Sequence, residues 1–338
     1  MTDIKELVKK VSKKEPRKRN DHVLLIDSMN TFIRSFSIIK AMNPQGEHIG
    51  GLIGFLKSLG FMMRTIEPTR IICVFDGKGS SINRRNANPN YKANRDNMKV
   101  TNWGMFDSRE EERASMSEQI RRLIDYLECL PVSLISMEKV EADDVISFIA
   151  QGLASTGKTC TIASSDKDFL QIVQPGVQVY APIKKVMITH ENVKDHITVS
   201  PVNYLLTKAL TGDKSDNLQG VKGVGTKTLI KEYPELLGNE KVDPKVILER
   251  AEEKIDEKKI FSRIIHDWDI VEQNINIMNL QQTRLDLNER NHIIEKLKEF
   301  PPPLSTGLFT YLMDKDKIET ITKNTQGWLE LFRPLTIN

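Results

Sequence analysis

Short apolar runs alternate with longer stretches of helical periodicity along this chain. Runs rich in β-branched and aliphatic residues predict β-strands at 22–26, 70–75, 132–135 and 159–163. Two of these runs end directly at an aspartate, Asp27 and Asp76, and the last is followed closely by Asp166. Because apolar strands are typical of parallel sheets covered on both faces, these aspartates are expected to meet at one edge of such a sheet.

Helical periodicity occupies much of the remaining chain. The pattern predicts helices at 49–63, 110–128 and from 142 onward, a hairpin or sheet edge at 177–180 and 185–189, and a mostly helical region after 234. The first of these helices belongs to a core rather than a membrane, because it is short, glycine-rich and interrupted by Lys57. The order of elements predicts an α/β fold with a largely parallel twisted sheet flanked by helices, then a helical C-terminal region.

Acidic residues gather in two clusters, one opening a predicted helix and one following a predicted strand. The clusters are Glu141-Ala142-Asp143-Asp144 and Asp166-Lys167-Asp168. Like charges this close repel unless a cation neutralises them, and oxygen ligands without matching His or Cys favour Mg²⁺ or Mn²⁺ over zinc. Either cluster alone fits a solvated helix N-terminus or an acidic loop equally well. The strand-end aspartates favour the metal site, since three strands would direct carboxylates to one point.

A different enzyme class also begins with a strand and an aspartate. A single aspartate after a strand is commonly a turn or helix cap. A haloacid-type phosphatase requires a second aspartate two residues later, where this chain has Met29. The sequence therefore disfavours that class.

Two further segments point to a polyanionic substrate. Residues 77–95 contain five basic residues and no acid, and they can clamp a nucleic acid beside the acidic site, with Tyr91 stacking on a base. A solvated charged loop is the alternative. Residues 210–217 add Asp213 and Asp216, and the glycine motif 220–229 resembles a helix-turn-helix whose amides approach a DNA phosphate. These glycines would equally cap two packed helices.

Composition agrees with a nucleic-acid partner. The formal charge is +3, with 49 basic and 46 acidic residues, so setting eight acids aside as a metal cluster leaves an excess of eleven bases elsewhere. Residues 1–20 form a basic tail, either a nucleic-acid arm or a solubilising end. The three cysteines lack metal-ligand spacing and fit buried thiols in a reducing cytosol, so we expect a cytoplasmic protein without membrane contact.

Taken in order, these motifs resemble the 5′ nuclease superfamily. Its members include flap endonucleases, the 5′-nuclease domain of bacterial DNA polymerase I and, closest in type and size, the ribonuclease H of T-even bacteriophages. The resemblance covers about residues 22–232 and rests on the strand ending at Asp27, Phe75-Asp76-Gly77, Tyr91-Lys92-Ala93-Asn94-Arg95, both acid clusters, and Gly212-Asp213-Lys214-Ser215-Asp216-Asn217 with the glycine motif.

The resemblance implies a role for each of these residues. One metal ion would be held by Asp27, Asp76, Glu141, Asp143 and Asp166, and a second by Asp168, Asp213 and Asp216; Asp144 has a matching acid in many relatives. Lys92 and Arg95 would be catalytic residues of a helical arch. DNA would contact Lys78, Arg84, Arg85, Tyr91, Lys92, Arg95, Gly220, Lys222, Gly223, Gly225 and Lys227, with a monovalent cation such as K⁺ at the glycine motif.

The implied organisation is a tail at 1–20, a 5′ nuclease or PIN-like core at 21–200 with an arch at about 78–113, a helix-turn-helix region at 201–240 and a helical region at 241–338. The implied activity is Mg²⁺-dependent 5′-3′ exonuclease, flap endonuclease and ribonuclease H cleavage in replication, by two-metal catalysis. Expected substrates are 5′-flap, nicked or branched DNA and RNA–DNA hybrids. The basic extension before the first strand favours a phage source, and hence a host cytoplasm.

The last expectations concern binding partners and an alternative, nonenzymatic function. We expect a monomer, with a sliding clamp or a single-strand-binding protein as candidate partners. Residues 326–332 space a Gln, an aliphatic residue and an aromatic like a clamp-docking motif, although a packed terminal helix is the simpler interpretation. The alternative function is a nonenzymatic DNA-binding replication scaffold, which the intact acid set disfavours because uncompensated carboxylates are costly.

Overall fold

The computed structural model describes residues 18–95, 98–318, 321 and 324–336. The basic tail expected at 1–20 therefore lies almost wholly outside the described residues. Among the helices that are described, none combines the length and the apolar character needed to cross a membrane.

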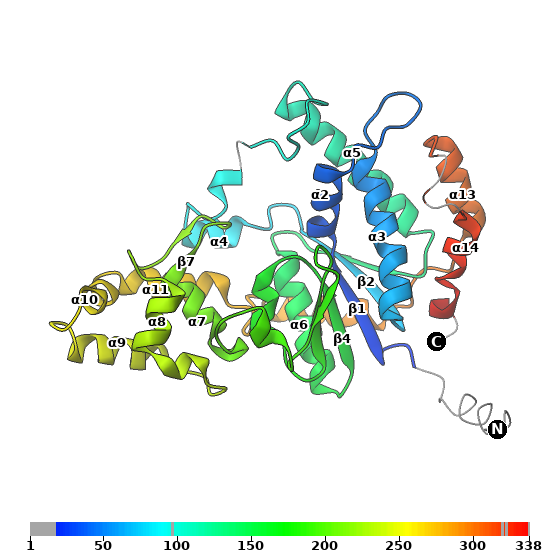
Figure 1. Cartoon of the computed structure of the whole chain (residues 1–338). Coiled ribbons are helices and arrows are strands. Elements are labelled where there is room, and N and C mark those ends of the chain that lie inside the picture. Colours follow the sequence, from blue (N-terminus) through cyan, green and yellow to red (C-terminus); the bar gives the residue numbers. More distant parts are fainter. Residues whose placement is uncertain (1–17, 96–97, 319–320, 322–323, 337–338) are drawn as a thin grey trace, which may run out of the picture.

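A six-stranded sheet forms the centre of the molecule (Figure 1). Its strands are β1 (His22–Asp27), β2 (Arg70–Phe75), β3 (Ser133–Ser136), β4 (Thr159–Ala163), β5 (Val177–Ala181) and β6 (Val186–Ile188). The order across the sheet is β3-β2-β1-β4-β5-β6, and every pairing is parallel except that of β5 with β6. The predicted parallel strands and the hairpin are thus confirmed. The chain adds β2 and β3 on one side of β1 and then returns to add β4 on the other side. The carboxyl ends of β1 and β4 therefore form a topological switch point.

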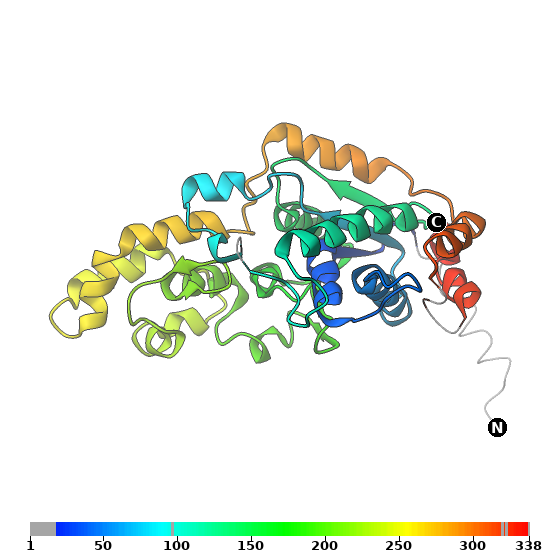
Figure 2. The ribbon, with the colours of Figure 1, turned by 90° about the horizontal axis from the view of Figure 1, so that it is seen from above.

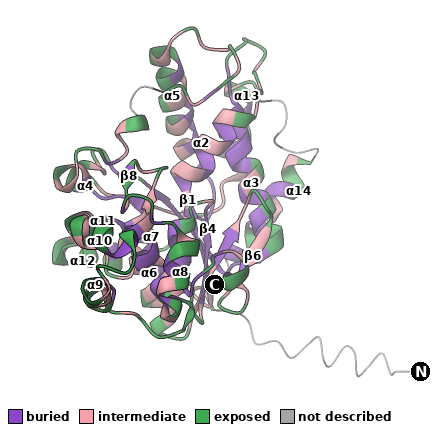
Figure 3. Cartoon of the chain, turned by 60° about the vertical axis from the view of Figure 1, so that its left-hand side comes forward, coloured by how far each residue is buried: buried purple, intermediate pink, exposed green. Residues whose placement is uncertain are grey.

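Helices cover both faces of this sheet. On one face lie α2 (Ser28–Ile38), α3 (Gly50–Ile66) and α5 (Arg109–Leu127), and on the other lies α6 (Ala142–Ser155). Leu24 and Ile26 of β1 join the first core cluster while Val23 and Leu25 join the second, as the two-residue period of a strand requires. Figure 3 shows the resulting pattern, with buried strands and helices exposed on their outer faces.

The helices from α7 onward are divided among three core clusters. The helices α7 (Pro201–Thr211), α8 (Thr226–Glu232), α9 (Pro244–Glu253), α10 (Lys259–His266) and α11 (Trp268–Met278) share a core of their own. By contrast, α12 (Leu287–Lys298) contributes to the α6 side of the sheet, and α13 (Thr306–Lys315) and α14 (Thr325–Glu330) contribute to the α3 side (Figure 2). The C-terminal residues therefore complete both layers of the main core.

The segment with clamp-like spacing is a packed helix. Trp328 and Leu329 of α14 are buried, as is Phe332 just beyond it. The indole of Trp328 lies against Gly60 of α3, where any Cβ would collide with it. A docking peptide must keep its apolar anchors available, so this burial supports the simpler interpretation, a packed terminal helix, over clamp docking.

The expected arch region has little regular structure before α5. It contains α4 (Ile82–Ala87) and a 3₁₀ turn (Ala93–Arg95), whereas the helix predicted at 110–128 is α5. Ser108 caps α5 by accepting a hydrogen bond from the backbone N–H of Glu111, which explains where that helix begins. A small antiparallel ribbon of β7 (Gly212–Asp213) and β8 (Leu218–Gln219) separates α7 from α8.

Candidate metal centre and nucleic-acid interface

The first group of carboxylates lies at the strand ends of the switch point. Asp27 is the last residue of β1 and accepts a hydrogen bond from Ser164 Oγ, beyond β4, at 2.8 Å. Asp76 follows β2 and accepts a hydrogen bond from the backbone N–H of Ala142 at 2.9 Å, which ties it to the start of α6. Burial, reinforced by the charges of Asp76 and Asp166, raises the pKa of Asp27 to about 7 in spite of the Ser164 hydrogen bond. The parallel register thus gathers carboxylates whose mutual repulsion favours neutralisation by a cation.

The second group opens α6 and surrounds an arginine. Arg84 of α4 is 3% exposed and contacts Glu141, Asp143 at 2.9 Å and Asp144 at 3.1 Å. Burial opposes the charge of Asp143, but the guanidinium of Arg84 outweighs it and lowers the pKa of Asp143. Burial and the neighbouring Asp143 charge raise the pKa of Asp144 to about 6. Arg84 was expected to contact DNA, but in this structure its side chain is buried among carboxylates.

The third group surrounds a lysine. The ammonium of Lys208, in the last turn of α7, contacts both Asp168 and Asp213. Burial and the charge of Asp166 raise the pKa of Asp168 to about 7 despite this contact. At Asp213 burial is outweighed by Lys208 and by hydrogen bonds from Ser215, so its pKa falls to about 2. The two carboxylates share one cation, and the more buried one keeps the higher affinity for protons.

The donor set fits a hard divalent cation. Carboxylate oxygens of Asp168, Asp213 and Asp216 lie within 4.8 Å of one another, close enough to share one ion. Mg²⁺ and Mn²⁺ prefer oxygen ligands, and this group offers only oxygens.

The basic residues of the expected arch lie over these acids. Lys92 Nζ is 3.0 Å from Glu141 Oε1, and Arg95 Nη2 is 2.7 Å from Asp216 Oδ1. The hydroxyl of Tyr91 donates a hydrogen bond to Glu141 at 3.0 Å, and the side chain is 2% exposed. This burial corrects the expected stacking of Tyr91 on a base. Lys92 and Arg95 remain partly or largely exposed, so their cations face both the acids and the solvent.

The remaining predicted arch contacts differ in accessibility. Lys78 is exposed, and Arg85 is half-buried. Lys78 is therefore the more accessible of the two to a nucleic acid.

The glycine motif forms a tight turn into α8. Gly220 packs against the backbone of Thr211, where a Cβ would collide, and Gly223 has a φ of +74°, which favours glycine. A Cβ at Gly225, the N-cap of α8, would meet nothing within 4 Å, so the start of this helix is open. Lys222 and Lys227 are exposed beside it. The glycines thus both permit the packing of the turn and leave its outer surface accessible.

A single hollow of about 660 Å³ links the acids to this turn. Its lining includes Asp166, Asp168, Asp213 and Arg95, and it extends to Thr226 at the first turn of α8. Asp166, Asp168 and Asp213 and the first turn of α8 therefore border one hollow, although Asp166 and Asp168 are far from α8 in the sequence.

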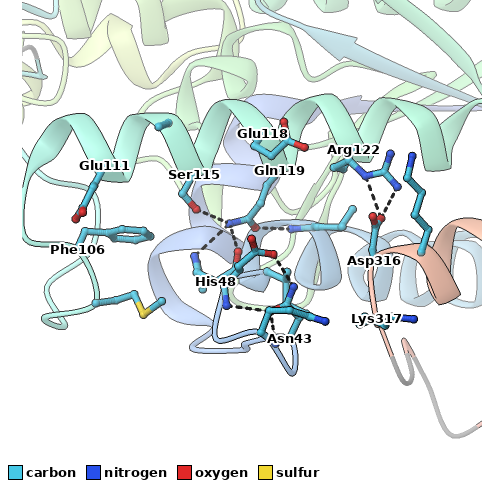
Figure 4. A pocket seen from close by; sticks show the side chains of 17 residues that line it. Asn43, His48, Phe106, Glu111, Ser115, Glu118, Gln119, Arg122, Asp316 and Lys317 are labelled. Atoms are coloured by element: carbon cyan, nitrogen blue, oxygen red, sulfur yellow. Dashed lines mark hydrogen bonds and ion pairs between the residues drawn. The ribbon is translucent and has the colours of Figure 1, made fainter.

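A larger hollow, of about 740 Å³, lies elsewhere, between α5, the loop before α3 and residues 315–317. Figure 4 shows that several of its polar side chains pair with one another: Gln119 reaches Ser115 and His48, and Arg122 reaches Asp316. None of the predicted site residues lines it. Size alone would therefore select the wrong cavity.

Two site residues are not singled out by the sequence patterns. Lys208 lies five residues before Asp213 in the last turn of α7, where a basic residue also fits an ordinary helix C-terminus. Ser164 directly follows β4, and only its hydrogen bond to Asp27 identifies it as part of the site. Lys208 stands in an acid-free stretch of the sequence, so only the fold shows which acids it contacts.

Comparison with known proteins agrees with this geometry. Residues 22–198 match the family described as 5′-3′ exonuclease, N-terminal resolvase-like domain. A 5′-3′ exonuclease of Bacillus subtilis is 32% identical over 226 residues, which cover 63% of this chain and 71% of that protein. A DNA polymerase I of Rhizobium leguminosarum is 30% identical over 251 residues, which cover 70% of this chain but only 22% of the polymerase.

A solved structure shares the fold. The bacteriophage T5 flap endonuclease, in a complex with DNA and metal ions, superposes with a TM-score of 0.61 at 15% identity, covering 88% of this chain and 99% of that one. At this identity the likeness establishes the architecture alone.

Proposed function

Since this chain belongs to the 5′-3′ exonuclease family, we propose that it hydrolyses phosphodiester bonds of branched DNA from the 5′ end. The observation that carries the proposal is the continuous hollow from Asp166, Asp168 and Asp213 to the first turn of α8. A duplex held by Lys222 and Lys227 would extend along this hollow to the carboxylates. The flap endonuclease named in the structural comparison supports a 5′-flap as the substrate to test first.

The acidic residues would hold metal ions, and the basic residues would contact the phosphate of the substrate. One divalent ion would be held by Asp27, Asp76, Glu141, Asp143 and Asp166, with Asp144 beside them, and a second by Asp168, Asp213 and Asp216. Mg²⁺ or Mn²⁺ bound there would supply an activated water and stabilise the leaving oxygen. Lys92 and Arg95, already paired with two of these acids, would turn to the scissile phosphate and stabilise its developing charge.

The finer parts of the proposal concern substrate and setting. We infer a T-even ribonuclease H-like role in primer and flap removal, with RNA–DNA hybrids and nicked duplexes as further substrates. The protein would act in the cytoplasm as a monomer, with K⁺ at the glycine turn. A single-strand-binding protein remains a candidate partner.

The decisive experiment is a cleavage assay with Mg²⁺ on labelled 5′-flap, nicked duplex and RNA–DNA hybrid substrates. The wild type should release short 5′ products, and Asp166→Asn should abolish cleavage while DNA affinity stays within a few fold. Asp195→Asn is the matched control, because Asp195 is an exposed acid in the 3₁₀ turn Val193–Asp195 outside the cluster. If the wild type binds these substrates but cleaves none, the scaffold alternative replaces the enzyme.

A further inference from the structure

A smaller pocket opens beside the acidic hollow. It has a volume of about 180 Å³ and lies at the carboxyl ends of β4 and β5, under the β5–β6 hairpin. Ser165, Asp166, Lys167 and His196 line both this pocket and the acidic hollow, so the two share a wall. A group bound in the pocket would therefore be a neighbour of whatever Asp166 acts on.

The pocket has an apolar floor. Leu170, Val179 and Ile188 are each no more than 5% exposed, and Ala181, the last residue of β5, also lines the pocket. Ile183, at the hairpin turn, is 67% exposed and forms part of the rim. These aliphatic faces can cover a flat ring but provide no charge to hold a phosphate.

The rim adds polar groups that the fold does not use. Among the described residues, the side chains of Lys167, Lys184 and His196 have no hydrogen-bond or ion-pair partner, although all three line the pocket. Donors and a planar ring are thus available at the mouth of an apolar cavity. This combination suits a planar group with apolar faces and a polar edge.

We propose that this pocket binds one unpaired nucleobase, that of a nucleotide adjoining the scissile phosphate. The inference rests on the proposed nuclease function and adds a subsite to it. The volume is below the ~300 Å³ of common small-ligand sites, so it admits a single base rather than a stretch of strand. Extruding a base into a protein pocket exposes the adjoining backbone to the catalytic groups. The β5–β6 hairpin would then influence where the strand is cut.

The test compares 5′-flap substrates that are intact or abasic at the nucleotide on either side of the cleavage position. In single-turnover assays the wild type should lose about tenfold in rate at one of the two positions, the effect expected when one base contact is removed. Ala181→Phe fills the pocket, so the intact and abasic substrates should then react at the same rate. Ile183→Ala trims only the rim and should reduce the tenfold ratio to roughly threefold.

A binding measurement separates this inference from the proposed function. With 2-aminopurine at the sensitive position and EDTA present, the wild type should raise fluorescence by unstacking the base, and Ala181→Phe should not. Leu308→Phe is the control, because it adds the same ring at a half-exposed position of α13, whose buried face belongs to the α3 side of the core.

Three outcomes decide the matter. Absence of cleavage by the wild type on every substrate overturns the nuclease proposal, while the fluorescence arm still tests the pocket. Normal cleavage with equal rates on intact and abasic substrates overturns the pocket. A fluorescence increase that survives in Ala181→Phe also overturns it.

Discussion

Replacement of Arg84 by glutamine tests how the acidic centre is held together. The guanidinium is 3% exposed and contacts Glu141, Asp143 and Asp144, so its loss leaves buried carboxylates without their cation. Breaking a buried ion pair from one side costs about 3–5 kcal/mol of unfolding free energy. In a chain of this size that corresponds to a fall in melting temperature of roughly 4–7 °C. Arg84→Gln should therefore be clearly destabilised without divalent metal.

The assay is thermal unfolding with EDTA and again with Mg²⁺. Mg²⁺ should recover part of the loss, because a divalent ion can neutralise the same carboxylates. Arg121→Gln is the matched control: Arg121 is 60% exposed and pairs with Glu118 on the surface of α5, so its melting temperature should not change measurably. If Arg84→Gln melts with the wild type in EDTA, the acids do not depend on Arg84 and the reasoning is refuted.

The other predictions concern catalysis, DNA affinity, pH and the core. Lys92→Ala should lower the single-turnover rate by roughly 10²–10³, and a change in KM alone would make Lys92 a binding residue. Replacing Lys222 and Lys227 together by alanine should flatten the salt dependence of duplex binding, measured as log Kd against log salt, because fewer counterions are released; an unchanged slope would leave the glycine turn a packing feature. Trp328→Ala should cost about 3–5 kcal/mol in denaturant unfolding, and near wild-type stability would contradict its burial. The folded protein raises the pKa of Asp27 above its unfolded value, to about 7, so this group stabilises the folded state at low pH. That contribution is lost as the pH rises from about 4 to 7. In Asp27→Asn the metal-free melting temperature should therefore fall less with pH over this window, as measured by thermal melts.

Local sequence determined the strands and the types of residue that gather at the acidic site. The runs at 22–26 and 70–75 are almost wholly apolar, and 159–163 adds only two threonines, so these strands favour cover on both sides of the sheet, which is typical of parallel strands. The aspartates that follow these runs, Asp27 and Asp76 directly and Asp166 three residues later, were then expected at the same edge of the sheet. The choice of oxygen ligands was likewise visible in residue types alone.

Tertiary structure decided which charges are free and which are paired. Arg84, Lys92 and Arg95 are alike in sequence, as bases in one polar segment, yet Arg84 is enclosed by three carboxylates and Arg95 is more than half exposed. Burial depends on which distant elements pack together, and the residue pattern of a short irregular segment does not indicate which elements those are. Tyr91 shows the same limit, since its polar surroundings in sequence conceal a ring packed against α7 and α11.

The C-terminal helix α14 also separates what sequence predicts from what tertiary structure decides. Helical periodicity around Trp328 predicted a helix but not the surface it would cover, and a clamp-docking peptide has the same spacing of apolar residues. The deciding contact is with Gly60, more than 260 residues earlier, whose missing side chain leaves room for the indole. Sequence by itself determined that these residues are apolar and helical, and only the packed fold determined that they are core, because burial is a property of pairs of surfaces and not of one segment.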